Sequence, residues 1–303
     1  MKVALITGAN GQDGSYLQEF LKNKGYIVKC FNREDDILNY SNVRTCISEY
    51  DEVEIYNLAA QSYLGTHNKM TYELNTMGLL NILESVKELG LTHKCKVFQA
   101  SSSEIFGSTD EVPQDEKTPY NPITLYGVSK LSAHLIAKHY REIHGVFVCS
   151  GILFNHESPR RKDTYVTQKI IKGLKSGECF TLGNIEARRD WGHAKDYVEA
   201  MWLMLQQDTP EDYIVATGVT HSVREFIDIA VQKMGKKIIW SGKGTHGEGR
   251  IDGKVVMRIS EEFYRPNDPK ALVGNPKKLE SLGWSRKYTL PDIIEEMLSP
   301  PLE

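Results

Sequence analysis

Tyr126 and Lys130 are the residues whose types and spacing most directly suggest chemistry. They stand four positions apart in the run Tyr-Gly-Val-Ser-Lys, so on a helix they lie on the same face. A phenol, with a reference pKa of about 10, is a poor base at neutral pH, but a neighbouring ammonium group favours its phenolate form. Such a pair can take the proton of a hydroxyl group while hydride leaves the same carbon. The spacing also occurs by chance in many helices, so the hypothesis depends on its surroundings.

Ser102 and Glu104 form a second candidate group, because they follow an apolar run in Ala100-Ser101-Ser102-Ser103-Glu104. Doubly wound α/β folds bind ligands at the carboxyl ends of their strands. A serine there can hydrogen-bond the hydroxyl being oxidised. Simple alcohol oxidation needs no carboxylate, whereas Glu104 can remove a proton alpha to a newly formed ketone. The competing interpretation of Glu104 is a helix-capping or solvated glutamate.

A glycine-rich turn lies near the N-terminus, between an apolar run and a helical pattern. It reads Thr7-Gly8-Ala9-Asn10-Gly11-Gln12-Asp13-Gly14. The first glycine permits a tight turn, the second lets backbone approach a pyrophosphate, and the third lets the helix pack closely on the sheet. Backbone N–H groups at the helix start then face phosphate oxygens. In this context the spacing predicts a dinucleotide site.

The end of the second expected strand bears on which nicotinamide cofactor is used. An acidic residue there binds the ribose 2′-hydroxyl, whereas an arginine accommodates a 2′-phosphate. This chain has Arg33 followed by Glu34 and Asp35, so it offers both. The order favours NADP slightly and leaves NAD open.

The elements that must position these residues follow from the alternation of short apolar runs with helical patterns, which indicates βαβ units and a parallel sheet. Glycine-rich residues 242–253 predict a loop. The expected strands are 3–6, 27–31, 54–58, 97–100, one within 145–153, and 213–216, and the expected helices are 15–24, 74–89, 126–144, 194–207, one opened by Ser222, and two pieces within 276–297.

The pattern predicts an α/β protein with a Rossmann doubly wound parallel sheet and a smaller, interleaved C-terminal substrate domain. We expect residues 1–153 to form the dinucleotide-binding domain, with a return of the chain near 190–220. Residues 154–303 would form mainly the substrate-binding domain.

Bulk composition restricts the partners. The chain has 303 residues and a formal net charge of −3, which gives no electrostatic case for nucleic acid or an anionic membrane. The five cysteines form no C-x-x-C pair, and no histidine stands beside them at metal-ligand spacing, so we expect reduced, buried thiols and no metal site. Without a signal peptide or a membrane-length apolar run, we expect a cytoplasmic protein.

Arginine clusters mark the second half of the chain: Arg160-Arg161, Arg188-Arg189 and Arg265 within Tyr-Arg-Pro. Arginine forks suit diphosphate oxygens, and a neighbouring tryptophan or tyrosine can stack on a base. Each cluster alone is also typical of a surface salt-bridge group. Several clusters after a Rossmann half favour a nucleotide-sugar pocket.

The sequence resembles the extended short-chain dehydrogenase/reductase family, and within it the GDP-mannose 4,6-dehydratases. The resemblance covers nearly the whole chain. The stretches that carry it are Gly11 to Leu17, Gly151 to Arg161, Arg189 to Tyr197, Ala216 to Gly218, Ser222 to Phe226 and Tyr264 to Pro266.

The resemblance implies a reaction, an NADP cofactor and a set of site residues. GDP-mannose would be converted into GDP-4-keto-6-deoxymannose by internal hydride transfer from C4 to C6 with loss of water. The implied catalytic residues are Ser102, Glu104, Tyr126 and Lys130, and the implied GDP-mannose contacts are Asn155, Lys169, Arg189 and Arg265. The implied NADP contacts are Gly8, Asn10, Gly11, Gln12, Asp13, Arg33, Asp36, Ile37, Leu58, Ala59, Ala60, Ser62, Tyr126, Lys130, His156 and Arg161.

Three departures from the family pattern matter. Ser102 stands where the family commonly has threonine, and Glu34 stands where it commonly has a second arginine. The segment between the second and third strands is also shorter, and in the family that segment helps to build a tetramer. We therefore expect a homo-oligomer, with a dimer through the helices that bear Leu79 and Leu131 and the tetramer left open.

Other activities remain open at this point. A nucleotide-sugar epimerase, a 4-reductase or a bifunctional dehydratase/4-reductase would also use the Tyr126–Lys130 pair, and Glu104 is the residue that separates them from a dehydratase. A dinucleotide-binding protein without catalytic activity could dispense with all three residues, which makes it the weaker alternative.

Overall fold

The computed structural model describes residues 2–31, 36–61, 69–263 and 271–299. Its main feature is a parallel six-stranded sheet in the order β2-β1-β3-β4-β5-β9. The order reverses beside β1, as in a doubly wound Rossmann sheet. The strands are β1 (Val3–Thr7), β2 (Ile27–Phe31), β3 (Val53–Asn57), β4 (Cys95–Ser102), β5 (Phe147–Leu153) and β9 (Asp212–Val215).

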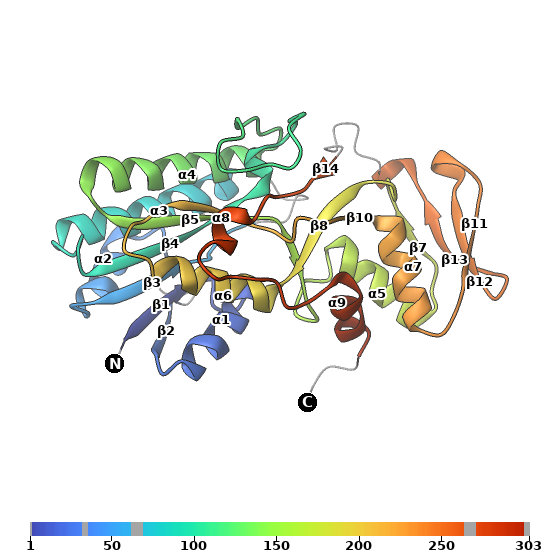
Figure 1. Cartoon of the computed structure of the whole chain (residues 1–303), viewed down its shortest axis with the longest axis horizontal. Helices are drawn as coiled ribbons and strands as arrows, with labels where there is room; N and C mark the ends of the chain where they lie inside the picture. The colour runs from blue at the N-terminus through green and yellow to red at the C-terminus, as the bar shows by residue number, and fades with distance from the viewer. Residues whose placement is uncertain (1, 32–35, 62–68, 264–270, 300–303) are drawn as a thin grey trace.

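Helices cover both faces of this sheet (Figure 1). On one face lie α1 (Gln12–Asn23) and α6 (Ala194–Leu205), and on the other lie α2 (Tyr40–Ser48), α3 (Lys69–Glu88) and α4 (Leu125–His144). Alternate strand residues explain the two layers: Ala4 and Ile6 belong to the core under α1 and α6, whereas Leu5 packs with residues of α3 and α4. The central strands β3 and β4 are buried on both faces, as parallel strands are, whereas the edge strand β2 is partly exposed.

The second half of the chain forms two smaller sheets beyond the carboxyl ends of the main strands (Figure 1). One has the order β10-β8-β14 with β6 also paired to β8, and the other has the order β11-β12-β13-β7. The strands are β6 (Asn155–Glu157), β7 (Phe180–Leu182), β8 (Arg188–His193), β10 (Thr220–Ser222), β11 (Ile238–Ser241), β12 (Glu248–Ile251), β13 (Lys254–Ile259) and β14 (Ala271–Leu272). The helices of this half are α5 (Val166–Ser176), α7 (Val223–Lys233), α8 (Lys277–Glu280) and α9 (Leu290–Leu298), with short 3-10 turns at Gly244–His246 and Glu261–Phe263. Another 3-10 turn, Ser103–Ile105, follows β4 in the first half.

The two halves interleave, because the chain leaves the main sheet after β5 and returns to it with α6 and β9. Asp190 of β8 joins three segments at the crossing. Its fully buried carboxylate accepts hydrogen bonds from Thr217 N at 2.9 Å, Gly218 N at 2.9 Å and Gly274 N at 3.3 Å, and also from the Thr217 hydroxyl. The Arg-Asp-Trp-Gly-His run at residues 189–193 is therefore in part a structural joint.

The expected Rossmann architecture is confirmed, and the expected strands and helices are present with shifted ends. The expected loop at 242–253 is wrong, because this stretch contains β12 and the turn into β13. The overlooked signal is Asp252-Gly253, a two-residue hairpin turn in which both residues have positive φ, 51° and 79°.

Two further expectations concern the surface. The five cysteines are free, but only Cys95 and Cys149 are buried, and Cys179 is exposed. None of the helices in the described ranges is long and apolar enough to cross a membrane.

Candidate active site

Tyr126 and Lys130 lie on the first two turns of α4, facing the carboxyl end of β4. The Thr124 hydroxyl caps this helix by accepting a hydrogen bond from Gly127 N at 2.9 Å. The Lys130 ammonium is 5.8 Å from the centre of the Tyr126 ring and donates to the Ala100 carbonyl at 2.8 Å. Helix and strand together therefore hold the predicted pair in one place.

The surroundings shift the proton affinities of this pair. Burial raises the pKa of the Tyr126 phenol, and the nearby Tyr165 and Glu104 raise it further, while a hydrogen bond with Ser102 and the charge of Arg161 act in the opposite direction. Burial lowers the pKa of Lys130 to about 8, although Asp13 acts against this. The phenol needs a positive charge beside it to act as a base. The buried Lys130 ammonium supplies this charge at pH values below its own pKa.

Ser102 and Glu104 lie at the same edge of the sheet. Ser102 ends β4, and its hydroxyl accepts a hydrogen bond from Glu104 N at 3.2 Å, which caps the short turn Ser103–Ile105. Ser102 hydrogen-bonds the Tyr126 phenol, and the charge of Glu104 raises the pKa of that phenol. The Glu104 backbone packs on the first turn of α4, because a Cβ at Gly127 would lie 2.6 Å from the Glu104 carbonyl oxygen. A phenol, an ammonium, a carboxylate and a serine hydroxyl thus gather at the carboxyl end of β4.

The glycine turn joins β1 to α1 next to this group. Gly8 has φ +67°, and a Cβ there would lie 2.8 Å from Ala59 N, while a Cβ at Gly14 would clash with the Gly8 carbonyl. Helix α1 begins after Gly11 without a side-chain cap, and Asn10 is exposed at the tip of the turn. Free helical N–H groups beside a close-packed glycine backbone fit a dinucleotide pyrophosphate.

The other predicted cofactor contacts after β2 and β3 are placed as follows. Leu58 and Ala59 follow β3, and their N–H groups donate to the Thr7 hydroxyl at 3.1 and 3.0 Å, beside the partly exposed Ala60. Asp36 is exposed and has a φ of +36°. The Ile37 side chain is buried against Gly78, so only the backbone of Ile37 can face a ligand.

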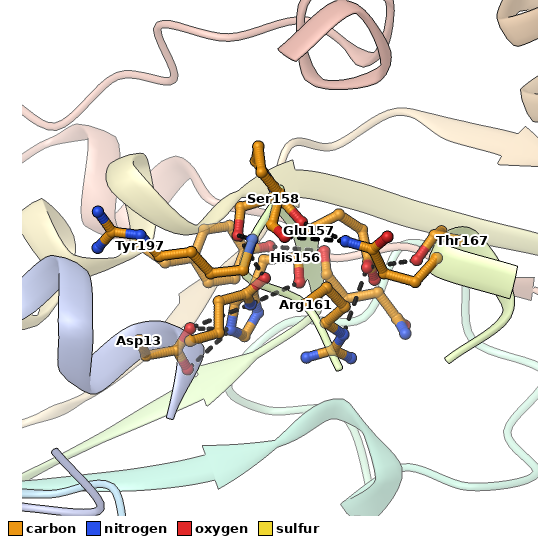
Figure 2. A network of polar contacts seen from close by, with 12 residues as sticks. Asp13, His156, Glu157, Ser158, Arg161, Thr167 and Tyr197 are labelled. Atoms are coloured by element: carbon orange, nitrogen blue, oxygen red, sulfur yellow. Dashed lines mark hydrogen bonds and ion pairs between the residues drawn. The ribbon is translucent and has the colours of Figure 1, made fainter. Parts of the chain in front are cut away.

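Figure 2 shows how His156 connects the two halves of the molecule. One ring nitrogen contacts the Asp13 carboxylate at 2.9 Å, the other contacts the Phe154 carbonyl at 2.7 Å, and the ring stacks on Tyr197 at 4.3 Å. Burial alone would raise the pKa of Asp13, but the charge and hydrogen bond of His156, the charge of Arg161 and a hydrogen bond from Gln12 together outweigh it, and the pKa is lowered. The Gln12 side chain donates a hydrogen bond to the His156 carbonyl at 3.1 Å and accepts one from the Ser158 hydroxyl at 2.7 Å. Gln12, Asp13 and His156 therefore brace the glycine turn.

Arg161 is the cation best placed to meet an anion. Its guanidinium lies 3.7 Å above the Tyr165 ring, and its Nε is 3.3 Å from the buried Glu157 carboxylate. Within the described ranges neither Nη group donates to a protein acceptor, and the side chain is close enough to Asp13 and Tyr126 for each charge to affect the other. An arginine fork held on one side and open on the other suits a phosphate oxygen.

Tyr165 and Glu157 also lie at this site, although the sequence pattern did not mark them as functional residues. Tyr165 precedes α5, touches Arg161 and acts on Tyr126. Glu157 is 2% exposed and accepts a hydrogen bond from the Thr167 hydroxyl at 2.6 Å. The sequence signal for Glu157 was its place in the run Gly151 to Arg161, and Tyr165 comes four residues after that run ends.

The predicted substrate residues come from three elements of the second half. Asn155 lies on β6, one strand from Arg189 on β8, whose side chain donates to the Arg188 carbonyl at 2.8 Å. Lys169 lies on α5, with its ammonium 4.2 Å from the centre of the Phe263 ring.

Two ideas about these clusters are wrong. Trp191 cannot stack on a base, because it is buried in the second core against Phe226. Arg188 and Arg160 are engaged elsewhere: Arg188 pairs with Glu225 at 2.9 Å, and Arg160 pairs with a glutamate of α1 at 2.6 Å. Arg33, Glu34, Ser62 and Arg265 lie outside the described residues.

Comparison with known proteins decides the family. A family model described as GDP-mannose 4,6 dehydratase matches residues 33–297. The chain belongs to the GDP-mannose 4,6-dehydratase family. It is 42% identical over 342 residues to GDP-mannose 4,6 dehydratase of Dictyostelium discoideum, covering 100% of this chain and 96% of that protein. It is also 42% identical over 340 residues to the Homo sapiens protein of the same name, and the match covers 99% of this chain and 91% of that protein.

Solved structures of other nucleotide-sugar enzymes share the fold. UDP-glucose 4-epimerase of Thermotoga maritima, solved with UDP-glucose, has a TM-score of 0.84 at 21% identity, with 98% of this chain and 97% of that chain covered. The dTDP-glucose 4,6-dehydratase of Bacillus anthracis, solved in complex with NAD, has a TM-score of 0.82 at 21% identity, with 98% and 96% covered. At this identity the likeness concerns architecture alone, so the narrower assignment to GDP-mannose 4,6-dehydratases depends on the sequence matches.

Proposed function

We propose that this chain is a GDP-mannose 4,6-dehydratase that converts GDP-mannose into GDP-4-keto-6-deoxymannose and water. The observation that carries the proposal is that Glu104 packs on the first turn of α4 and its charge acts on the Tyr126 phenol, in a chain of this family. An epimerase or a 4-reductase needs the phenol and the ammonium but no base directed at C5. A carboxylate at that place favours elimination of water.

The side chains divide the work by position. Tyr126 takes the proton of the sugar O4, with Lys130 supporting the phenolate and Ser102 holding the hydroxyl. A bound nicotinamide would accept hydride from C4 and return it to C6. The ketone at C4 acidifies the C5 proton. Glu104 removes this proton and gives a proton to the departing C6 hydroxyl, which leaves as water. Once C6 has received hydride, C5 takes up a proton again.

We propose NADP as the cofactor. The glycine turn, residues Leu58 to Ala60, Lys130, His156 and Arg161 surround one edge of the sheet and fit a dinucleotide. Asp36 and Ile37 would lie near its adenosine end. The choice of NADP over NAD rests on Arg33, which would hold the 2′-phosphate, and Ser62 would complete the set.

We propose that residues 1–153, with the return near 190–220, bind the dinucleotide, and that residues 154–303 mainly bind the nucleotide sugar. Asn155, Lys169 and Arg189 face the sugar-nucleotide side from β6, α5 and β8, and Arg265 would join them. The five free cysteines fit a reducing compartment such as the cytoplasm.

We also propose a homodimer formed by α3 and α4. Their outer faces expose apolar side chains that a monomer has no reason to gather: Met77 is 44% exposed, Leu135 47% and Ile143 67%. Leu79 is buried in the core and cannot contribute, whereas Leu131 is half-buried at the edge of this face. Packing of two such helix pairs would make a four-helix contact.

The test is product analysis by mass. Purified protein is incubated with NADP and GDP-mannose, and separately with UDP-glucose and dTDP-glucose. We expect loss of one water from GDP-mannose alone. A product of unchanged mass would indicate an epimerase, and a product two hydrogens heavier after addition of NADPH to the dehydrated sugar would reveal a second, reductive activity. GDP-mannose that stays unchanged throughout would refute catalysis.

A further inference from the structure

A row of buried polar side chains crosses the main sheet beneath α3 and α4. Thr7, Asn57 and Gln99 are direct register partners on β1, β3 and β4, and they are 2%, 3% and 1% exposed. Two residues earlier on the same face the strands carry apolar core residues. Three buried polar groups in an apolar layer require full hydrogen bonding, because unpaired ones would destabilise the fold.

The hydrogen bonds run in one direction across the row. The Thr7 hydroxyl donates to Asn57 Oδ1 at 2.7 Å, Asn57 Nδ2 donates to Gln99 Oε1 at 2.7 Å, and Gln99 Nε2 donates to the Ala100 carbonyl at 3.0 Å. A carbonyl can only accept, so it fixes the orientation of the Gln99 amide, and that amide fixes Asn57 in turn.

The row ends on the catalytic lysine. The Ala100 carbonyl that receives Gln99 also receives the Lys130 ammonium at 2.8 Å. Among the described residues it is the only protein acceptor for Lys130, which is 3% exposed. One carbonyl oxygen therefore determines where the ammonium lies, and two donors share that oxygen.

The other end of the row meets the segment that would face the cofactor. The Thr7 hydroxyl accepts hydrogen bonds from Leu58 N and Ala59 N. A second chain runs alongside: Gln61 N donates to Asn75, the Asn75 amide donates to the Ser129 hydroxyl at 2.9 Å, and that hydroxyl donates to the Tyr126 carbonyl at 2.7 Å. Residues 58–61 are thus connected to both Lys130 and Tyr126 through buried groups.

We propose that Gln99 is a positioning residue that sets the place of the Lys130 ammonium through the shared Ala100 carbonyl, in register with residues 58–61. This inference rests on the proposed function only where it predicts a change in kcat. Gln99 itself touches neither substrate nor cofactor in this scheme. It acts by holding one oxygen and by competing with Lys130 for it.

The competition has a defined sign. The Gln99 amide brings a partial positive charge to an oxygen that already binds an ammonium. Gln99→Met removes this donor at similar volume, so one competitor of Lys130 for the Ala100 oxygen is lost and the charged form of Lys130 is favoured. The pKa of Lys130, lowered by burial to about 8, therefore rises in the variant.

The first experiment measures this without substrate or cofactor. The side-chain signal of Lys130 is followed by NMR against pH in isotope-labelled protein and assigned through Lys130→Met. Gln114→Met is the matched control, because Gln114 is also fully buried and bonds two backbone groups, the Glu111 carbonyl and Val273 N, but does not contact Lys130. We expect the Lys130 signal to titrate at a higher pH in Gln99→Met and at the wild-type pH in Gln114→Met. An unchanged midpoint in both would overturn the proposal.

The second experiment separates binding from turnover. We expect Gln99→Met to lower kcat on the order of 10- to 100-fold through displacement of Lys130, while the dissociation constant for NADPH stays within about twofold. A loss of NADPH affinity equal to the loss of kcat would refute a positioning role. If the wild-type chain leaves GDP-mannose unchanged, the proposed function fails, and the NMR titration still decides the role of Gln99.

Thr7→Val keeps the proposal testable if Gln99→Met does not fold, because valine matches threonine in shape and lacks only the hydroxyl at the far end of the row. We expect a midpoint shift in the same direction, restored to the wild-type value in Thr7→Ser. Identical titrations of Thr7→Val and Thr7→Ser would contradict transmission along the row.

Discussion

Replacement of Glu104 by glutamine tests the proposed division of labour most directly. The substitution keeps the shape of the side chain and the backbone turn that Ser102 caps at 3.2 Å, but it removes the carboxylate that would take the C5 proton. Glu104 belongs to the turn Ser103–Ile105 after β4, whereas the glycine turn and its bonds to His156 belong to other elements, so we expect cofactor affinity to stay that of wild type.

The expected loss follows from the role of the carboxylate. A positioned general base contributes about 10²- to 10⁴-fold, so water loss should slow by that factor. Oxidation at C4 should survive, because Tyr126 and Lys130 are unchanged. The charge of Glu104 raises the pKa of Tyr126, and its removal lowers that pKa. Proton removal from O4 should therefore begin at a lower pH in the variant than in wild type.

The assay is mass analysis of the sugar after reaction in deuterated water. Wild type should release a dehydrated product that carries deuterium at C5. The Glu104→Gln variant should instead hold a ketone that retains the C6 hydroxyl, recovered from denatured enzyme at no more than one per site. Tyr126→Phe should yield no ketone at all, and Glu111→Gln, at an exposed glutamate outside the site, should behave as wild type.

Dehydrated product formed by Glu104→Gln at the wild-type rate would refute the reasoning, since another group would then be the base. Absence of any ketone would also count against it, because the phenol and the ammonium would then not suffice for the first step.

Three other substitutions test the remaining parts. Asp13→Asn should lower the free energy of unfolding by about 2 kcal/mol at neutral pH through loss of the charged bond to His156. Because the pKa of Asp13 is lowered in the fold, this contribution is complete above about pH 4 and is lost as the pH falls through the lowered value, so urea unfolding of the two proteins should converge in acid. Arg161→Lys should raise the dissociation constant for NADPH about tenfold, measured by fluorescence titration, because lysine offers neither the fork nor the stack; unchanged affinity would remove Arg161 from the site. Met77→Lys combined with Leu135→Lys should give a monomer in sedimentation with unfolding free energy within about 0.5 kcal/mol of wild type, and a persistent dimer would locate the contact elsewhere.

The local elements were predictable because their signals are local. The short apolar runs that alternate with helical patterns predicted the parallel strands, and the four-residue spacing of Tyr126 and Lys130 placed both on one face of α4. The turn at Asp252-Gly253 was overlooked although its signal was present, because a glycine-rich stretch was interpreted by composition instead of by turn type.

What the sequence by itself determined is the chemistry available: a glycine turn before a helix, a phenol and an ammonium one helical turn apart, and a carboxylate two residues after a strand-end serine. What only the tertiary structure decided is which distant groups act on them. Asp13 meets His156 across 143 positions of chain, and Gln99 reaches Lys130 of α4 through the Ala100 carbonyl of its own strand. Such contacts depend on strand order and register, and these follow from burial of the whole core and are not written in any short run of residues.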